Sequence, residues 1–280
     1  MIIGVDQFMS LKTTRKLNNG VEIPVIGLGV YKVDEGETVY DTVRSALEIG
    51  YRHIDTASLY KNEEGVGRAI ADSGIPREDI FVTTKVWNDE QGYDETLAAF
   101  ERSLERLNMD YVDLYLVHWP VPGKYKETWK ALEKIYEDKR AHAIGVSNFH
   151  PHHLDDLMKD ATIKPVINQI ELHPQLSQVE VREYCQEHHI AVEAWAPIGK
   201  ASYLDHPVLE ELAEKYQKTA AQIIIRWDYQ NDIITIPKSV RASRQKENAD
   251  IFDFELSEAD MKKIEGMNNN NRLGMNPDEL

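Results

Sequence analysis

Arg52-His53-Ile54-Asp55-Thr56-Ala57-Ser58-Leu59-Tyr60 is followed along the chain by Phe81-Val82-Thr83-Thr84-Lys85 and by Val112-Asp113-Leu114-Tyr115-Leu116-Val117-His118. Each segment contains a short run typical of a β-strand, and polar side chains stand at or just past its end. In a β/α barrel the C-terminal ends of the strands share one rim, which carries the active site. The segments therefore predict that the carboxyl of Asp55, the phenol of Tyr60, the amine of Lys85 and the imidazole of His118 meet there.

Strand and helix patterns alternate along the rest of the chain. The expected strands are Val25–Leu28, His53–Asp55, Ile80–Thr84, Tyr111–Val117, Ala143–Val146, Ile167–Ile170, Ala191–Ala194 and Ile233–Thr235. The expected helices are Thr38–Ile49, Glu63–Ser73, Tyr93–Asn108, Tyr125–Asp138, Pro151–Lys159, Val179–His189 and Ala220–Tyr229. Several strands are continuous apolar runs, as expected for parallel strands buried on both faces. The alternation predicts an α/β fold, a (β/α)8 TIM barrel.

Three segments fall outside this repeat. Thr14 to Ile23 has the alternation of a β-hairpin around the turn Asn18-Asn19-Gly20, where Asn-Gly supplies the positive φ of a tight turn. Additional helix is expected near His206–Tyr216, and the tail Asn268–Leu280 is expected to be loop. No linker divides the chain, so we expect a single domain over residues 1–280.

A doubly wound dinucleotide fold is the alternative architecture. Its glycine fingerprint follows a strand and opens a helix. The nearest match, Gly65-Val66-Gly67-Arg68-Ala69-Ile70, lacks the third glycine and lies inside a helical pattern. We therefore treat this match as coincidental.

Composition limits the possible partners and compartment. The chain of 280 residues has 48 acidic and 32 basic side chains, a formal net charge of −16, which disfavours nucleic acid and anionic membranes. Its one cysteine, Cys185, excludes an internal disulfide framework and fits a reducing compartment. Met1-Ile2-Ile3-Gly4-Val5-Asp6 lacks the pattern of a signal peptide, and no apolar run is long enough to span a bilayer. These features predict a cytoplasmic protein.

The four rim residues together make a proton donor. A phenol is protonated at neutral pH, so Tyr60 can donate to a carbonyl oxygen that gains charge. Lys85 would stabilise the phenolate and lower the phenol pKa, Asp55 would hold Lys85, and His118 would donate a second hydrogen bond. Each residue also has a purely structural explanation. Tyr60 could be a partly buried surface tyrosine, Asp55 a helix cap, Lys85 an exposed strand end and His118 a hydrogen-bonded core histidine. Four such side chains at three successive strand ends favour a site.

The chain resembles the aldo-keto reductase family from Leu17 to Asn248, and is most similar to its bacterial branch of diketogluconate and glyoxal (methylglyoxal) reductases. The motifs are Gly27-Leu28-Gly29-Val30-Tyr31, Arg52–Ala57 with Tyr60, Thr84-Lys85-Val86-Trp87, His118-Trp119-Pro120, Gly145-Val146-Ser147-Asn148-Phe149, Asn168-Gln169 and Ile236-Pro237-Lys238-Ser239. The resemblance implies a TIM barrel that binds NADPH/NADP+ without a Rossmann fold and reduces aldehydes, ketones or dicarbonyls. It makes Asp55, Tyr60, Lys85 and His118 the catalytic residues, with Tyr60 the general acid. A monomer is the family expectation.

A hydride donor is required, because no side chain supplies hydride. Lys238-Ser239-Val240-Arg241-Ala242-Ser243-Arg244-Gln245-Lys246 carries four positive charges after the last strand, where TIM barrels often bind phosphate. The resemblance assigns Lys238, Ser239 and Arg244 to the 2′-phosphate and Glu247 and Asn248 to the adenine, whereas Arg241 is left as an exposed charge. It further assigns Ser147, Asn148 and Gln169 to the nicotinamide carboxamide, Trp195 to stacking on the ring, and Gly199 and Lys200 to the pyrophosphate. Gly29, Val30 and Tyr31 complete the expected cofactor contacts.

Aromatic side chains are expected to wall the substrate pocket. Tyr31, Trp87 and Trp119 each adjoin a strand end, beside His118. The tail after Asn268 is short, which leaves the pocket open and predicts broad use of small carbonyl substrates.

Three other functions compete with a reductase. A Schiff-base aldolase would use Lys85 as nucleophile, although pairing with Asp55 keeps the amine protonated. A metal hydrolase would use His53, Asp55, His118, Glu171 and His173, but this set has no His-x-His or His-Glu-x-x-His spacing, and we expect no metal. A non-enzymatic barrel that binds NADPH is the third.

Overall fold

The computed structural model describes residues 10–280. Met1–Asp6, where we expect no signal peptide, lies outside the described residues. None of the helices between residues 10 and 280 has the length and apolar character needed to cross a membrane.

Eight parallel strands form the centre of the described chain. They are β3 (Leu28–Gly29), β4 (His53–Asp55), β5 (Phe81–Val86), β6 (Val112–Val117), β7 (Ala141–Ser147), β8 (Ile167–Glu171), β9 (Ala191–Trp195) and β10 (Ile234–Thr235), and they pair in chain order. A parallel bridge between Ile26 and Thr235 connects the last strand to the segment before the first. This closure confirms the predicted (β/α)8 barrel.

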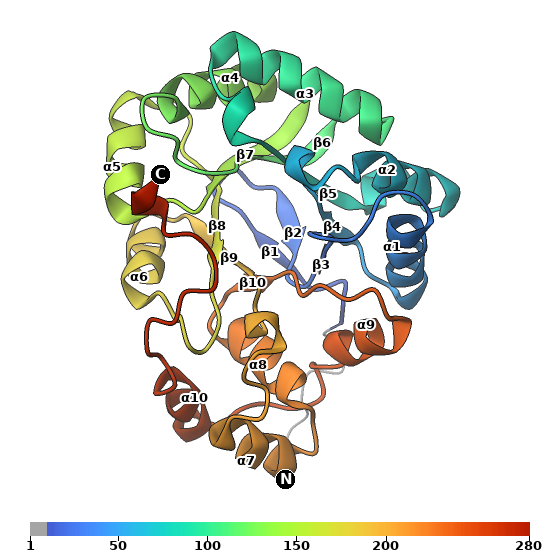
Figure 1. Cartoon of the computed structure of the whole chain (residues 1–280), viewed down its shortest axis with the longest axis vertical. Helices are drawn as coiled ribbons and strands as arrows, with labels where there is room; N and C mark the ends of the chain where they lie inside the picture. The colour runs from blue at the N-terminus through green and yellow to red at the C-terminus, as the bar shows by residue number, and fades with distance from the viewer. Residues whose placement is uncertain (1–9) are drawn as a thin grey trace.

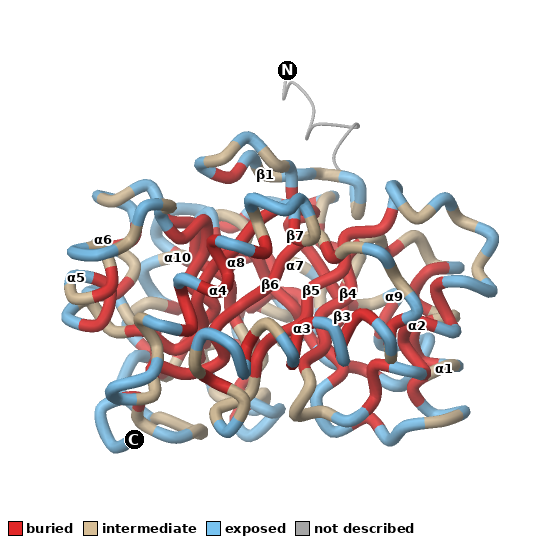
Figure 2. The backbone as a smooth tube through the Cα atoms, turned by 90° about the horizontal axis from the view of Figure 1, so that it is seen from above, coloured by how far each residue is buried: buried red, intermediate tan, exposed pale blue. Residues whose placement is uncertain are grey.

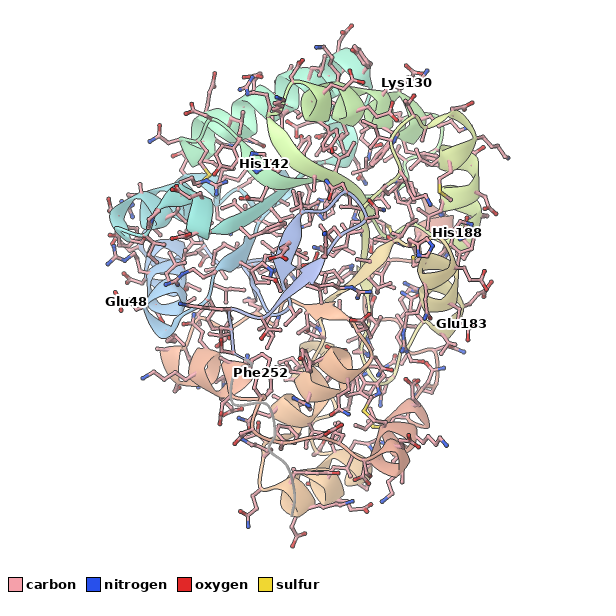
Figure 3. The ribbon with its side chains drawn as sticks, turned by 180° about the vertical axis from the view of Figure 1, so that it is seen from behind. Glu48, Lys130, His142, Glu183, His188 and Phe252 are labelled. Carbon is pink, nitrogen blue, oxygen red and sulfur yellow. The ribbon has the colours of Figure 1, made fainter. Side chains whose placement is uncertain are left out.

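Helices surround the strands (Figure 1). They are α1 (Glu37–Ile49), α2 (Glu63–Asp72), α3 (Tyr93–Leu107), α4 (Tyr125–Glu137), α5 (Pro151–Asp160), α6 (Val179–Glu187), α7 (Pro207–Tyr216), α8 (Ala220–Gln230), α9 (Ala242–Ala249) and α10 (Glu258–Glu265). Charged side chains such as Glu48, Lys130 and Glu183 lie at the outside of this ring (Figure 3). The apolar faces of the helices point toward the sheet, as amphipathic helices do in this architecture.

The predicted hairpin covers one end of the barrel. It consists of β1 (Thr14–Lys16) and the antiparallel β2 (Glu22–Pro24). Leu17 and Ile23 are buried against strand residues that include Phe81, Leu114 and Ile167. The hairpin and the C-terminus lie at opposite ends of the barrel, and buried backbone runs between them (Figure 2). The hairpin therefore seals the N-terminal end and leaves the other rim for chemistry.

Most element boundaries agree with the sequence patterns within two residues, but three differences have physical causes. The first strand is Leu28–Gly29 instead of Val25–Leu28, because Val25 and Ile26 contribute only the bridge that closes the barrel. Helices α9 and α10 were not located by residue range, because each is a short, polar helix of 8 residues without a clear apolar stripe. The tail is loop as expected, except for a 3₁₀ turn at Pro277–Glu279.

The glycine match considered for a dinucleotide fold lies inside α2. A Cβ atom on Gly67 would collide with the backbone carbonyl of Leu107 at the end of α3. Gly67 thus permits close packing of two helices and has no role at a nucleotide, which removes the basis for the doubly wound alternative.

Candidate active site

The three strand ends bring the four predicted catalytic residues together. Asp55 is the last residue of β4, Lys85 lies near the end of β5, and His118 directly follows β6. Tyr60 ends the 3₁₀ turn Ser58–Tyr60 after β4. Because β4, β5 and β6 are adjacent and parallel, these side chains share one rim.

Lys85 is the centre of the group. Its ammonium nitrogen lies 2.6 Å from Asp55 Oδ1, 2.9 Å from the carbonyl oxygen of Thr56 and 3.4 Å from the Tyr60 hydroxyl. The lysine side chain is fully buried. Burial alone would lower the pKa of Lys85, but the neighbouring Asp55, Tyr60 and Glu193 together outweigh burial, so the pKa lies above its ordinary value and the amine stays charged.

Tyr60 differs from the expectation in the direction of its pKa shift. Burial raises the pKa of Tyr60 to about 12, although Lys85 acts to lower it. The sequence shows the cation but not the burial, so it predicts a lowered pKa for Tyr60; desolvation of the phenolate is the larger effect in this pocket. Tyr60 is therefore protonated throughout the neutral range, as a general acid requires.

His118 completes the rim opposite Tyr60. The centres of the two rings are 5.9 Å apart, and the Trp87 ring lies 5.1 Å from the His118 ring. Burial, then the nearby charge of Lys85, holds the pKa of His118 well below its ordinary value, so the imidazole is neutral. Its Nδ1 atom is buried and has no hydrogen-bond partner among residues 10–280. A neutral imidazole keeps one N–H group, which can donate to a carbonyl and orient it.

A second polar layer lies beneath the catalytic residues, inside the barrel. The side-chain amide of Gln169 donates to Asp55 Oδ2 at 2.8 Å and to Glu193 Oε2 at 2.9 Å. Burial and the nearby Asp55 raise the pKa of Glu193 to about 8. On the other side of Glu193, His53 Nε2 is 3.4 Å from Glu193 Oε1.

Glu193 is not among the residues predicted for the site, and His53 is predicted only as a ligand of the alternative metal centre. Both side chains are fully buried. The sequence does contain a signal for Glu193. It is an acid inside the apolar run Ala191-Val192-Glu193-Ala194-Trp195, which is predicted to be buried on both faces. These residues position the rim from below.

The residues expected at the nicotinamide are close together. Trp195 Nε1 donates to Asn148 Oδ1 at 2.8 Å, and Asn148 Nδ2 donates to the His118 carbonyl oxygen at 3.0 Å. Ser147 Oγ donates to the Gln169 carbonyl oxygen at 2.8 Å. The Gln169 amide group, by contrast, already binds two carboxyl groups. Asn148 and Trp195 thus form one unit beside His118, which suits a flat ring.

The basic segment leads into α9. Lys238 and Arg244 are exposed, whereas Ser239 and Asn248 are buried. The ammonium of Lys238 lies 3.1 Å from the Lys32 carbonyl oxygen, next to Tyr31. Glu247 accepts a hydrogen bond from Thr219 Oγ1 at 2.9 Å. The segment therefore presents exposed cationic groups.

Other expected cofactor residues lie along the same rim. A Cβ on Gly29 would come within 2.9 Å of the Ile236 carbonyl oxygen, so only glycine fits where the barrel closes; Val30, which follows, is buried. Lys200 lies in the turn Gly199–Ala201, and its ammonium is 3.0 Å from the carbonyl oxygen of Leu273 in the tail.

Of the aromatic residues expected at the substrate, Tyr31 lies against Tyr60 and Trp87 lies against His118. Tyr31 is 47% exposed, and its ring centre lies 5.0 Å from that of Tyr60. Trp119 is buried, and its carbonyl oxygen accepts from Gln91 Nε2 at 2.8 Å. Tyr31 is therefore the most accessible wall of the expected pocket.

The five residues of the alternative metal hydrolase do not converge. Within the described residues they form no cluster of metal-ligand atoms. Glu171 pairs with His173 at 3.0 Å and accepts from the backbone N–H groups of Leu273 and Gly274. This carboxylate holds the tail.

A different histidine cluster, which is not among the predicted sites, does form. His150, His152, His153 and Asp278 bring one ligand atom each to within 4.8 Å of one another. The His-x-His spacing of His150-Pro151-His152 was the available signal. No sequence pattern pointed to Asp278, because it is 126 residues away from His152.

Comparison with known proteins identifies the class of this fold and site. A model of the Aldo/keto reductase family matches residues 25–269. Among solved structures, a mutant of Gox0644 in complex with NADPH aligns with a TM-score of 0.92 at 45% identity, over 96% of this chain and 98% of that chain. The chain belongs to the aldo/keto reductase family, which confirms the resemblance and the expectation of an oxidoreductase enzyme.

Within that family, bacterial reductases are close relatives. Glyoxal reductase of Bacillus subtilis (strain 168) is 58% identical over 271 residues, which are 97% of this chain and 98% of that protein. Methylglyoxal reductase DkgA of Escherichia coli (strain K12) is 43% identical over 276 residues, which are 97% of this chain and 99% of that protein. The predicted similarity to this bacterial branch is thereby confirmed.

Proposed function

We propose that this enzyme reduces small aldehydes, ketones and dicarbonyls to alcohols with NADPH, with Tyr60 as the proton donor. The main observation behind this proposal is that the buried Lys85 ammonium contacts both Asp55 and the Tyr60 hydroxyl. Family membership and the NADPH complex of the related Gox0644 mutant support the cofactor.

The residues present fit such a cofactor. The exposed Lys238 and Arg244 offer cations for the 2′-phosphate, with Ser239 between them and Glu247 and Asn248 in α9 near the adenine. Asn148 and Trp195 lie beside His118 and would hold the nicotinamide, together with Ser147 and Gln169. Gly29, Val30, Tyr31 and Lys200 line the same rim. When bound, NADPH supplies the hydride that a carbonyl carbon accepts.

The side chains of the rim supply the proton and the orientation. His118, neutral because it is buried beside Lys85, donates a hydrogen bond to the carbonyl oxygen and fixes its position. As that oxygen gains charge, Tyr60 transfers its proton to it. Lys85 remains charged through Asp55 and stabilises the phenolate that is left. The alcohol leaves, and the phenolate regains a proton from solvent.

The substrate class follows from the pocket and the relatives. Tyr31 and Trp87 provide aromatic walls beside Tyr60 and His118, and Trp119 directly follows His118 in the chain. The relatives named above are a glyoxal reductase and a methylglyoxal reductase. We expect kcat/KM to vary less than about tenfold across small carbonyls, since binding differences of about 1.4 kcal/mol correspond to that factor. A preference of several decades for one substrate would contradict this breadth.

The direct test is loss of NADPH absorbance with methylglyoxal and a panel of other carbonyls. Oxidation by the wild type and none by Tyr60→Phe would support a reductase. No oxidation with any carbonyl would favour the NADPH-binding, non-enzymatic alternative. Borohydride trapping of substrate on Lys85 would favour the Schiff-base aldolase, and activity that survives exhaustive chelation excludes the metal hydrolase.

We further propose that the protein is a cytoplasmic monomer of one barrel domain. The net charge of −16 and the single, buried Cys185 support this proposal. Light scattering of the purified protein would measure its mass, and a dimer would contradict it.

A further inference from the structure

A group of metal-ligating side chains lies away from the catalytic rim, at the start of α5. His150 precedes the helix, and His152 and His153 lie in its first turn. Asp278 reaches them from the 3₁₀ turn in the C-terminal tail. In Figure 1 the red tail runs from α10 past α6 and ends beside α5. The start of α5 and the C-terminal tail, which are far apart in sequence, thus bring the histidines and Asp278 together.

The distances make Asp278 the centre of this cluster. Its Oδ2 atom lies 2.9 Å from His150 Nδ1, and its Oδ1 atom lies 2.6 Å from His152 Nε2. His153 Nε2 is farther from Oδ1, at 3.7 Å. Around a tetrahedral Zn²⁺ with bonds of about 2.0–2.2 Å, ligand atoms are roughly 3.3–3.5 Å apart. In this arrangement His150 Nδ1 and His152 Nε2 donate to the carboxylate, so each ring can bind a metal only after its proton has left that nitrogen. Once those protons have left, small side-chain rotations would admit an ion between His150, His152 and Asp278.

His153 plays a different part. Its Nδ1 atom accepts a hydrogen bond from the backbone N–H of His150 at 3.0 Å. The proton of the neutral ring is therefore on Nε2, which leaves no lone pair there for a metal. His153 instead fixes the backbone of His150, and Pro151 starts the helix in the required direction.

We propose that His150, His152 and Asp278 bind a divalent transition-metal ion such as Zn²⁺. Two imidazoles and one carboxylate are a donor set that suits Zn²⁺, and water can fill the remaining position. His152 and Asp278 are open to solvent, with side chains 64% and 44% exposed. A groove of about 760 Å³ borders the cluster, lined by residues that include Asp155, Gln178 and Arg272, so an ion can reach the site.

The ion would fasten the tail to the barrel. Between α10 and Asp278, the tail contacts the rim through the backbone N–H groups of Leu273 and Gly274, which donate to Glu171. A Cβ on Gly274 would lie 2.5 Å from the Trp195 ring, so the tail packs directly on that side chain. A metal at Asp278 therefore holds the segment that covers Trp195.

The first experiment measures binding. After treatment with EDTA and its removal, the full-length protein is titrated with ZnCl₂ in a calorimeter. We expect one ion per chain, with at least about tenfold weaker binding in His152→Gln and in Asp278→Asn, since each variant removes one ligand and about 1.4 kcal/mol corresponds to tenfold. His142→Gln is the matched control, because His142 is a half-exposed histidine 3.7 Å from Asp113. Unaltered binding in His152→Gln would overturn the site.

The second experiment tests the tail. Trypsin can cut after Arg272, which is partly exposed in the tail. We expect ZnCl₂ to slow this cut several-fold in the wild type and in His142→Gln, but not in Asp278→Asn. Mass spectrometry distinguishes this cut from cuts elsewhere. Asp278→Asn that binds Zn²⁺ as tightly as the wild type would show that the helix histidines act alone, and would overturn the proposed link to the tail.

Discussion

The ammonium nitrogen of Lys85 lies 2.6 Å from a carboxylate oxygen of Asp55, and both side chains are buried. Two charges are thus held inside the barrel, directly below the Tyr60 hydroxyl. Removing one partner leaves an uncompensated charge in a region of low dielectric. The pair should therefore matter for the stability of the fold as well as for the proposed reaction.

Asp55→Asn or Lys85→Met should lower the free energy of unfolding by about 3–5 kcal/mol, because each leaves a buried charge without its partner. The double variant should recover part of this loss, yet remain inactive. Urea unfolding measures both. The surface pair Lys130–Glu127 has the same 2.6 Å separation but is half exposed, so Glu127→Gln should cost at most about 1 kcal/mol. Equal losses at the two pairs would contradict the argument.

Tyr60→Phe should reduce kcat by about 10²–10⁴-fold, the usual contribution of a general acid. The ring remains, so the packing against Tyr31 and His118 is kept. The Kd for NADPH, measured by fluorescence titration, should stay within about threefold of the wild-type value, because the lost hydroxyl serves the transition state instead of cofactor binding. A variant that retains a tenth of wild-type turnover would exclude Tyr60 as the proton donor.

The rate of reduction should depend little on pH between about 6 and 9. Tyr60, whose pKa burial raises to about 12, stays protonated over this range. His118, whose pKa is held well below its ordinary value by burial and by Lys85, stays neutral. We expect kcat/KM to change less than about threefold, since neither group changes its protonation state there. A tenfold change centred near pH 6.5 would mean that His118 titrates normally.

Stability should fall as the pH rises from about 6 to 8. Burial, then Asp55, raises the pKa of Glu193 from 4.5 to about 8, so the folded state holds a proton that the unfolded chain has released. The stabilisation is complete below about pH 4.5 and is lost as the pH approaches 8, by up to about 1.4 kcal/mol per pH unit.

Glu193→Gln provides the control for this pH effect. The substitution keeps an acceptor for Gln169 but has no proton to lose, so its urea unfolding should vary less over the same range. The contribution of His53 has the opposite sign: burial lowers the pKa of His53 to about 4, and its stabilisation is lost as the pH falls toward that value. Parallel curves for wild type and variant above pH 6 would contradict the assignment to Glu193.

Arg244→Ala should weaken NADPH binding by about 10–100-fold, as expected for loss of a charge-assisted contact of about 1.5–3 kcal/mol with the 2′-phosphate. NADH lacks this phosphate, so its affinity should change little. Arg241→Ala, an equally exposed cation in the same segment, is the matched control and should behave as wild type. Equal losses for both cofactors would show that Arg244 acts on another part of the molecule.

The sequence by itself determined the barrel and the four rim residues. Apolar runs of parallel strands and the 3.6-residue helical period are local patterns, so they located β4 to β10 within two residues. Because parallel strands end on the same side, placing Asp55, Lys85 and His118 at strand ends was enough to bring them to one rim. The weakly patterned α9 and α10 could not be located in this way.

The tertiary structure alone decided the features that depend on burial and on distant contacts. The pKa of Tyr60 rises because desolvation of the buried phenol exceeds the effect of Lys85. The sequence shows that a cation is present but not how deeply the phenol is buried. Glu193 joins the site only because Gln169 lies between it and Asp55 inside the closed barrel. Asp278 meets His152 because the tail folds back across the rim. Local sequence patterns determine where helices and strands form. The electrostatic environment of a side chain and its contacts with distant segments arise only when the whole chain folds.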